Sequence, residues 1–205
     1  LPTTSQPSPE AFLQYFREAK EAGDDVICIL LASKLSGTCQ SALIARDIVE
    51  YDRIYIIDSM QATLGTQLLL DRAFALREEG KTAEQIVEIL EKEKEKICIY
   101  LIVDTLLYLQ KGGRLSTTGM VVGSALNLKP ILSVRYGEVR VAGLARGQKS
   151  AWDKVLKQLR KTAGWTRQEA TILALQEKRN VSADLRHLLR NILMRNTKRQ
   201  FRLVL

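Results

Sequence analysis

The chain has 205 residues, of which 46% are hydrophobic and 26% charged, so it is long enough for one large or two small globular domains with a real core. Its net charge of +8 is unevenly placed, because residues 139–205 hold 16 Lys and Arg against 4 Asp and Glu. We find no uncharged apolar run of membrane-spanning length and no basic-then-apolar leader, and we expect a soluble cytoplasmic protein.

The first hundred residues alternate between helical and strand-like patterns. The first helix is predicted to begin at Ser8-Pro9-Glu10, with Ser8 as its N-cap, and to end at Gly23. Two continuous apolar runs, 26–33 and 54–59, have the length and composition of strands that are covered on both faces. Further helices are predicted at residues 39–51, about 62–79, and 82–96 with Thr82 as cap.

The pattern changes after about Lys96. A strand and a short helix ending in a double glycine come first. A longer helix, a β-hairpin with Tyr136-Gly137 in its turn and four further elements follow. In chain order these elements are the strand 97–103, the helices 104–113 and 114–128, the hairpin 129–143, the helix 146–164, the strand 170–176, the helix 183–195 and the strand 200–205.

These patterns predict two domains. Residues 1–95 read as a three-layer α/β/α domain with a parallel sheet, because strand–loop–helix units repeat there. Residues 96–205 read as a two-layer α+β domain with a mixed sheet, because its strands are joined by a hairpin as well as by helices. The boundary is placed in the charged EKEKEK run.

The segment TTSQPS near the start presents the hydroxyls of Thr3, Thr4 and Ser5 before the Gln6-Pro7 pair. Proline disfavours helix at the preceding residue and keeps this backbone extended. Two interpretations stay open at this point. The segment is a helix-capping stretch, or it is a rigid loop that aims a hydroxyl at a ligand.

The loop LSGTCQSA follows the first predicted strand, at the edge of a parallel sheet where ligands collect. Gly37, between Ser36 and Thr38, lets backbone amides approach a ligand, and the following helix offers its positive N-terminal end. This combination suits a carboxylate or a phosphate. The loop has neither P-loop spacing nor the GxSxG pattern of a nucleophile elbow, so a binding site fits better than a catalytic one.

The segment LQKGGRLSTTGMVVGSALNL places Arg114 directly after Gly112-Gly113. An arginine fixed beside a flexible turn is a good clamp for a carboxylate or phosphate. The alternative is a glycine helix end with a surface arginine. The uncharged stretch 115–128 is either deeply buried or lines an apolar cavity.

The cysteines and the single histidine do not indicate a metal site, a disulfide framework or a catalytic triad. Cys28, Cys39 and Cys98 are widely spaced without a CxxC or Cys/His grouping, and two of them sit in apolar runs. His187 lies in a helical pattern without a second histidine nearby, and a structural role is predicted for it. We expect no catalytic residue, no metal and no cofactor.

The order and approximate spacing of five segments resemble the DegV family of bacterial lipid-binding proteins, closely over residues 1 to about 150. The segments are PTTSQPSPEAF, SKLSGTCQSA, YIIDS, VDTLLYLQKGGRLS and LNLKPIL. The resemblance implies two α/β domains with one long-chain fatty acid buried between them. It also implies a separate fatty acid kinase subunit that phosphorylates the bound carboxyl group with ATP, so that this protein is a carrier and not an enzyme.

The resemblance also implies the roles of individual residues. Thr4 and Ser36 would hydrogen-bond the carboxylate, and Arg114 would support the head-group region. The expected ligand-binding residues are Thr4, Ser5, Ser36, Gly37, Thr38, Gly113 and Arg114.

Two departures from the DegV pattern concern the ends of the chain. Family members carry a strand and an acidic-serine turn well before TSQPS, whereas this sequence opens almost at that segment. They also end in a histidine and a Gly-Pro-Gly stretch, which QFRLVL does not match. We therefore expect an incomplete carboxylate site. Cys39 also stands where an aromatic residue is usual in the family, and it could alter the cavity.

Two other functions compete with lipid binding. The basic region 139–205 suggests binding to nucleic acid or to an anionic surface, including transient contact with an anionic membrane, although a solvated basic face explains the charge equally well. No sequence-specific nucleic-acid motif accompanies it. A hydrolase or phosphotransferase built on the SGT loop is the third hypothesis, and the missing general base argues against it.

Overall fold

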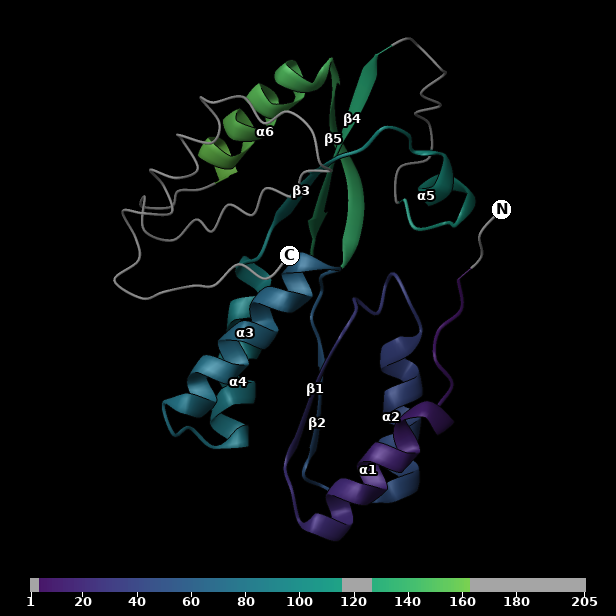
Figure 1. Cartoon of the computed structure of the whole chain (residues 1–205), viewed down its shortest axis with the longest axis vertical. Helices are drawn as coiled ribbons and strands as arrows, with labels where there is room; N and C mark the ends of the chain where they lie inside the picture. Colours follow the sequence, from purple (N-terminus) through teal and green to yellow (C-terminus); the bar gives the residue numbers. More distant parts are fainter. Residues whose placement is uncertain (1–3, 116–126, 163–205) are drawn as a thin grey trace. The chain divides into compact units, whose positions relative to one another are not determined.

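The computed structural model describes residues 4–115 and 127–162, which contain two separate sheets and the helices around them (Figure 1). The helices are α1 Glu10–Ala22, α2 Thr38–Val49, α3 Leu64–Glu78, α4 Ala83–Glu93, α5 Leu107–Lys111 and α6 Gln148–Thr162, and a short 3-10 turn spans Lys94–Lys96. The strands are β1 Val26–Leu30, β2 Ile54–Asp58, β3 Ile99–Ile102, β4 Leu128–Arg135 and β5 Glu138–Arg146.

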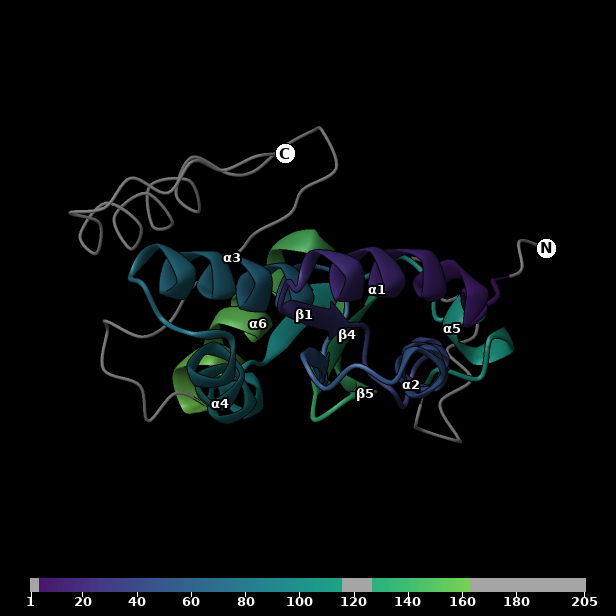
Figure 2. The same cartoon turned by 90° about the horizontal axis from the view of Figure 1, so that it is seen from below.

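Strands β1 and β2 form a parallel pair in which Val26 lies opposite Ile54 and Leu30 opposite Asp58. Figures 1 and 2 show β1 between α2 on one side and α4 on the other. Side chains alternate along each strand, so one set packs against α1 and α2 and the other against α3 and α4. The predicted three-layer arrangement of helix, parallel sheet and helix is confirmed.

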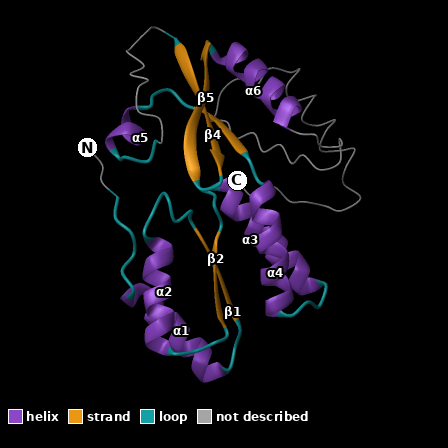
Figure 3. Ribbon diagram, turned by 180° about the vertical axis from the view of Figure 1, so that it is seen from behind, coloured by secondary structure: helices purple, strands orange, loops and turns teal. Residues whose placement is uncertain are grey.

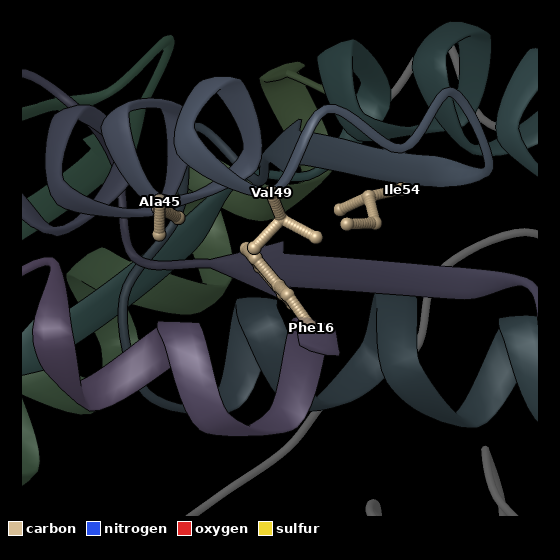
Figure 4. Packing of buried hydrophobic residues seen from close by; sticks show 5 residues of the cluster. Phe16, Ala45, Val49 and Ile54 are labelled. Carbon is tan, nitrogen blue, oxygen red and sulfur yellow. The ribbon is translucent and has the colours of Figure 1, made fainter. Parts of the chain in front are cut away.

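The layer between the sheet and α1–α2 is built on small residues of α2. Ala42 and Ala45 are fully buried, and they share one cluster with Phe16 of α1 and with Val49 and Ile54. Figure 4 shows the side chain of Phe16 reaching from α1 toward Val49 of α2. Close helix approach across alanines gives the dense packing that a small domain needs.

Strands β3, β4 and β5 form an antiparallel sheet in the order β3–β4–β5. Figure 3 shows β4 and β5 as its two long strands. The turn between them has positive φ at Tyr136 (52°) and at Gly137 (77°), the combination of a type I′ hairpin turn. The predicted hairpin is confirmed. Within the described residues, parallel pairing at this sheet is limited to a single bridge between Leu115 and Val139, so the expected mixed sheet is almost wholly antiparallel.

The two predicted helix caps have different outcomes. Thr82 caps α4 through a complete capping box with Gln85, as predicted. Ser8 does not cap α1, because the cap residue is Pro9, whose backbone is already helical and which has no side chain that can accept a bond. Ser8 instead accepts the amide of Ala11 with its backbone carbonyl, at 3.1 Å.

Some sequence predictions lie outside the described residues. These are most of the helix 114–128 and everything after residue 162, including His187. Both sheets lie in a compact unit from Leu1 to Val155, and Leu156 begins a second unit. The boundary near residue 95 falls between the two sheets and stays a prediction. Among the described helices, none is long and apolar enough to cross a membrane.

Candidate functional site

The candidate site is the edge of the parallel sheet where β1 and β2 both end. Asp58, the last residue of β2, accepts a hydrogen bond from Ser33 Oγ at 2.5 Å and another from the backbone N–H of Met60 at 2.8 Å. One carboxylate thus ties the loop after β1 to the loop after β2. Because it is occupied by these donors, Asp58 acts as a brace between the loops.

Two hydroxyls face each other in the loop after β1. Ser36 Oγ and Thr38 Oγ1 lie 2.8 Å apart, and the backbone N–H of Thr38 donates to Ser36 Oγ at 3.4 Å. Thr38 is the first residue of α2, and the N-cap residue before it, Gly37, has no side chain that could accept the helix amides. The amides of the first helical turn and the positive end of the helix dipole therefore adjoin the hydroxyl pair, an environment that favours an anion.

The segment that contains Thr4 and Ser5 is held against this loop by Gln6. Gln6 Nε2 donates to Ser41 Oγ of α2 at 3.2 Å. A Cβ at position 37 would lie 1.8 Å from Gln6 Oε1, so the side chain of Gln6 occupies the space that Gly37 leaves open. The φ of Gly37, −73°, is accessible to any residue, so what the glycine provides is room for the side chain of Gln6.

Arg114, which follows α5 in the sequence, contacts the same loop with its guanidinium group. Its Nε donates to the backbone carbonyl oxygen of Leu35 at 3.1 Å, and its Nη1 donates to the carbonyl of Gly112. Gly113 between them has a φ of 69°, the left-handed conformation that glycine adopts without strain. Arginine has five N–H donors, and these bonds use two of them, which leaves donors for a ligand.

Leu35 and Lys34 attach the loop to the second sheet in two further ways. Leu35 packs against the apolar cluster formed by Leu106 and the strands β4 and β5. Lys34 Nζ pairs with Glu138 Oε1 at 2.8 Å, beside the hairpin turn. The hydrogen bond from Lys34, followed by those from Arg140, lowers the pKa of the Glu138 carboxyl.

Cys39 is not a reactive group of this site. Its side chain is buried, and its thiol donates to the carbonyl of Leu31 at 3.4 Å. Burial, followed by the charge of Asp58, raises its pKa to about 11, so the thiol stays protonated at neutral pH. In the part of the chain that the structure describes, no three His, Cys, Asp or Glu side chains group as a metal site requires.

The structure brings most of the predicted site residues to one place. Ser36, Gly37 and Thr38 lie together where the loop after β1 leads into α2, and Arg114 donates a hydrogen bond to Leu35, the residue before Ser36. Thr4 and Ser5 are exposed, and no hydrogen bond within the described ranges joins them to Ser36 or Thr38. Their contact with a ligand stays a prediction.

Three structural features of the site were not predicted from the sequence. They are the packing of Gln6 on Gly37, the hydrogen bonds by which Asp58 joins two loops, and the buried side chain of Gln61. The only signal for the last two was their position, with Asp58 at the end of a predicted strand and Gln61 just after it. Nothing local distinguishes Gln6 from an exposed loop residue.

Taken together, the site offers two hydroxyls, the N-terminal end of a helix and a guanidinium, a set of groups that recognises a carboxylate.

The DegV family model, described as "Uncharacterised protein, DegV family", matches residues 1–202. A DegV domain-containing protein of Caldanaerobacter subterraneus is 42% identical over 162 residues, which are 79% of this chain and 58% of the relative. One of Clostridium acetobutylicum is 38% identical over 186 residues, 91% of this chain and 66% of the relative.

Three solved structures are similar to this chain. A DegV family protein from Thermus thermophilus, described by its fatty acid binding, is 40% identical with a TM-score of 0.71 and covers 79% of this chain and 57% of its own. DegV from Bacillus subtilis, described as a fatty acid binding protein, is 34% identical with a TM-score of 0.65. The match covers 78% of this chain and 57% of the Bacillus subtilis chain. A stearic acid-binding protein from Eubacterium ventriosum is 29% identical with a TM-score of 0.71. The match covers 78% of this chain and 56% of the Eubacterium ventriosum chain. This chain spans less than two thirds of the length of the curated relatives and solved structures described above.

Proposed function

Because the chain belongs to the DegV family, we propose that it binds a long-chain fatty acid, with the carboxylate held at the loop after β1. In this proposal Ser36 and Thr38 donate hydrogen bonds from their hydroxyls, and Arg114 supplies the positive charge. Thr4 contributes a further hydroxyl from the segment that Gln6 holds in place. Gly37 and Gly113 provide the backbone conformations, and Ser5 lies beside Thr4.

The observation that carries the proposal is the bond from Arg114 to Leu35, which places a guanidinium one residue from the Ser36–Thr38 hydroxyl pair. A hydrogen bond to a charged group contributes about 1.5–3 kcal/mol, more than a neutral bond does. Three such donors fix the orientation of a carboxylate but supply only part of the affinity.

The acyl chain supplies most of the remaining affinity in this proposal. Each buried methylene contributes about 0.8 kcal/mol. Leu35, which follows Lys34 in the same loop, already packs into the apolar cluster of the second sheet, so apolar side chains begin next to the polar end of the site. An amphipathic ligand with one carboxylate and a long hydrocarbon tail matches this division.

We further propose that the protein is a carrier in the cytoplasm that presents the carboxylate to a separate kinase, which transfers phosphate from ATP. The side chains near Ser36 support a binding role, because the braced Asp58 and the protonated Cys39 offer no free base or nucleophile. Both the kinase and the cellular location come from the family resemblance.

The decisive experiment is organic extraction of freshly purified protein followed by mass spectrometry. We expect a stoichiometric long-chain fatty acid, and a delipidated sample should rebind oleate with a measurable dissociation constant. Protein that neither carries nor rebinds a fatty acid would rule out the proposed function. The carrier role is tested separately, by measuring formation of acyl phosphate after addition of a fatty acid kinase subunit and ATP.

A further inference from the structure

Gln61 has an unusual position for a polar side chain. It follows β2 in the loop that leads to α3, and its exposed fraction is 0%. Its Nε2 donates to the backbone carbonyl of Ile97 at 2.9 Å, which fixes the orientation of the amide. Its Oε1 is buried and accepts no hydrogen bond from any residue that the structure describes.

An amide of this kind is a poor filler for a protein core. A buried acceptor without a donor destabilises the folded state, whereas an apolar side chain of the same length fills the space without that penalty. The bond from Gln61 Nε2 to the carbonyl of Ile97 gives a reason for an amide at this position, because an apolar side chain could not make it.

The backbone of Gln61 leads directly to the candidate ligand loop. Its carbonyl oxygen accepts the N–H of Ala32 at 2.9 Å, and the carbonyl of Ala32 in turn accepts the N–H of Ser36 at 3.1 Å. Two consecutive hydrogen bonds therefore connect Gln61 to the residue that is proposed to bind the carboxylate.

The side chain of Gln61 and the residue before it lead to the second sheet. Ile97, which receives the amide, lies just before β3, and the carbonyl of Met60 accepts the N–H of Gly137 in the hairpin turn at 2.9 Å. Residues 60 and 61 thus contact the ligand loop on one side, and on the other side the residue Ile97 before β3 and the turn between β4 and β5.

The surrounding backbone is strained in a way that holds Gln61 in place. Met60 has a φ of 53° and Thr63 a φ of 49°, which non-glycine residues adopt only when their surroundings impose it. Ser59, which is fully buried, accepts the N–H of Gln61 with its hydroxyl at 3.1 Å. Gly65 of α3 lies so close that a Cβ there would be 2.7 Å from Gln61 Cβ.

We propose that Gln61 is a positioning residue, which holds the loop containing Ser36 in register with the second sheet. It acts through Ala32 and does not touch the ligand. This inference rests on the proposed function for its effect on affinity, but its effect on the loop can be measured without a ligand.

The first test uses Gln61→Met, which keeps the length of the side chain and removes the amide. We expect the dissociation constant for oleate to rise about tenfold. Without ligand, amide hydrogen exchange of residues 32–36 and of Gly137 should become faster than in the parent protein. Leu76→Ala, in the same apolar layer but at the far end of α3, is the matched control for lost stability.

Three outcomes would overturn the inference. They are unchanged exchange in residues 32–36 of Gln61→Met, an oleate affinity within twofold of a parent that binds, or equal effects in Leu76→Ala. If the parent protein binds no oleate, the proposed function is refuted but the role of Gln61 is not. The hydrogen exchange of residues 32–36 then decides whether Gln61 positions the loop. If Gln61→Met does not fold, Gly65→Ala replaces it, because the added Cβ pushes Gln61 aside without removing its amide.

Discussion

Arg114 Nε donates to the backbone carbonyl of Leu35 at 3.1 Å, although 79 positions separate the two residues in the sequence. This bond joins the GGR segment to the loop that contains Ser36 and Thr38. It also leaves much of the guanidinium exposed and able to meet a ligand.

Replacement of Arg114 by lysine should weaken fatty acid binding about tenfold, because an ammonium group cannot hold the Leu35 carbonyl and a carboxylate in the fixed geometry of a guanidinium. The melting temperature should change little, since the side chain is exposed. Titration calorimetry with oleate measures the affinity. Arg46→Lys, on the exposed side of α2, is the control and should bind like the parent.

Removal of the Ser36 hydroxyl in Ser36→Ala should raise the dissociation constant for oleate about tenfold or more, because a bond to a charged oxygen is lost. Thr38 Oγ1 also loses its partner at 2.8 Å, so the double variant with Thr38→Ala should be less than additive. Thr82→Ala removes a hydroxyl from the cap of α4, away from the site. It should lower stability by about 1 kcal/mol and leave affinity unchanged.

Gly37→Ala tests whether Gln6 holds the first segment in place. The backbone at Gly37 tolerates alanine, but the new Cβ would meet Gln6 Oε1 at 1.8 Å and must displace that flexible side chain. We expect faster proteolysis within residues 4–8, weaker oleate binding and almost no change in melting temperature. Gly143→Ala, whose Cβ makes only an ordinary contact at 4.0 Å, should show none of these effects.

The pair between Lys34 and Glu138 predicts a pH dependence of stability. The pKa of Glu138 lies below its ordinary value because of the bonds from Lys34 and Arg140, so the ionised form stabilises the folded state. This contribution is present above the ordinary carboxyl pKa and is lost as the pH falls through the folded-state value. Glu138→Gln should melt about 1–2 °C lower than the parent at pH 7, and the difference should shrink at an acidic pH below the ordinary carboxyl pKa. A constant difference at both pH values would contradict this explanation.

Two shielded thiols, of the buried Cys39 and the half-buried Cys28, predict the opposite pH dependence of stability, a loss at alkaline pH. Burial raises the pKa of Cys28 and of Cys39 to about 11, from an ordinary thiol value of 9.0. The thiolate fraction at pH 8 is therefore about 100-fold lower than in denaturant, and a thiol reagent should react with them correspondingly more slowly. Since the folded-state pKa values are raised, this stability is complete below about pH 9 and is lost as the pH rises through about 11. Reaction of both thiols in the native protein as fast as in denaturant would show that the fold does not shield them.

Local sequence patterns were sufficient for most of the described elements. The alternation of apolar runs with helical periods predicted β1 to α4 in the right order, and Thr82 with Gln85 gave the start of α4 correctly. The hairpin turn at Tyr136-Gly137 was placed correctly as well. Such features depend on residues within one or two turns of each other, which is why a sequence alone can specify them. The prediction that Ser8 is the N-cap of α1 was wrong, because the N-cap residue is Pro9, whose backbone is already helical.

The sequence by itself determined the alternation of strands and helices, the motifs that resemble DegV proteins and the chemical types available for a carboxylate site. Only the tertiary structure decided which of these groups meet. The bond from Arg114 to Leu35, the packing of Gln6 on Gly37 and the burial of Gln61 depend on how the loops at the end of β1 and β2 contact the hairpin and the first segment. Such contacts join residues tens of positions apart, and their geometry follows from packing that no local periodicity encodes.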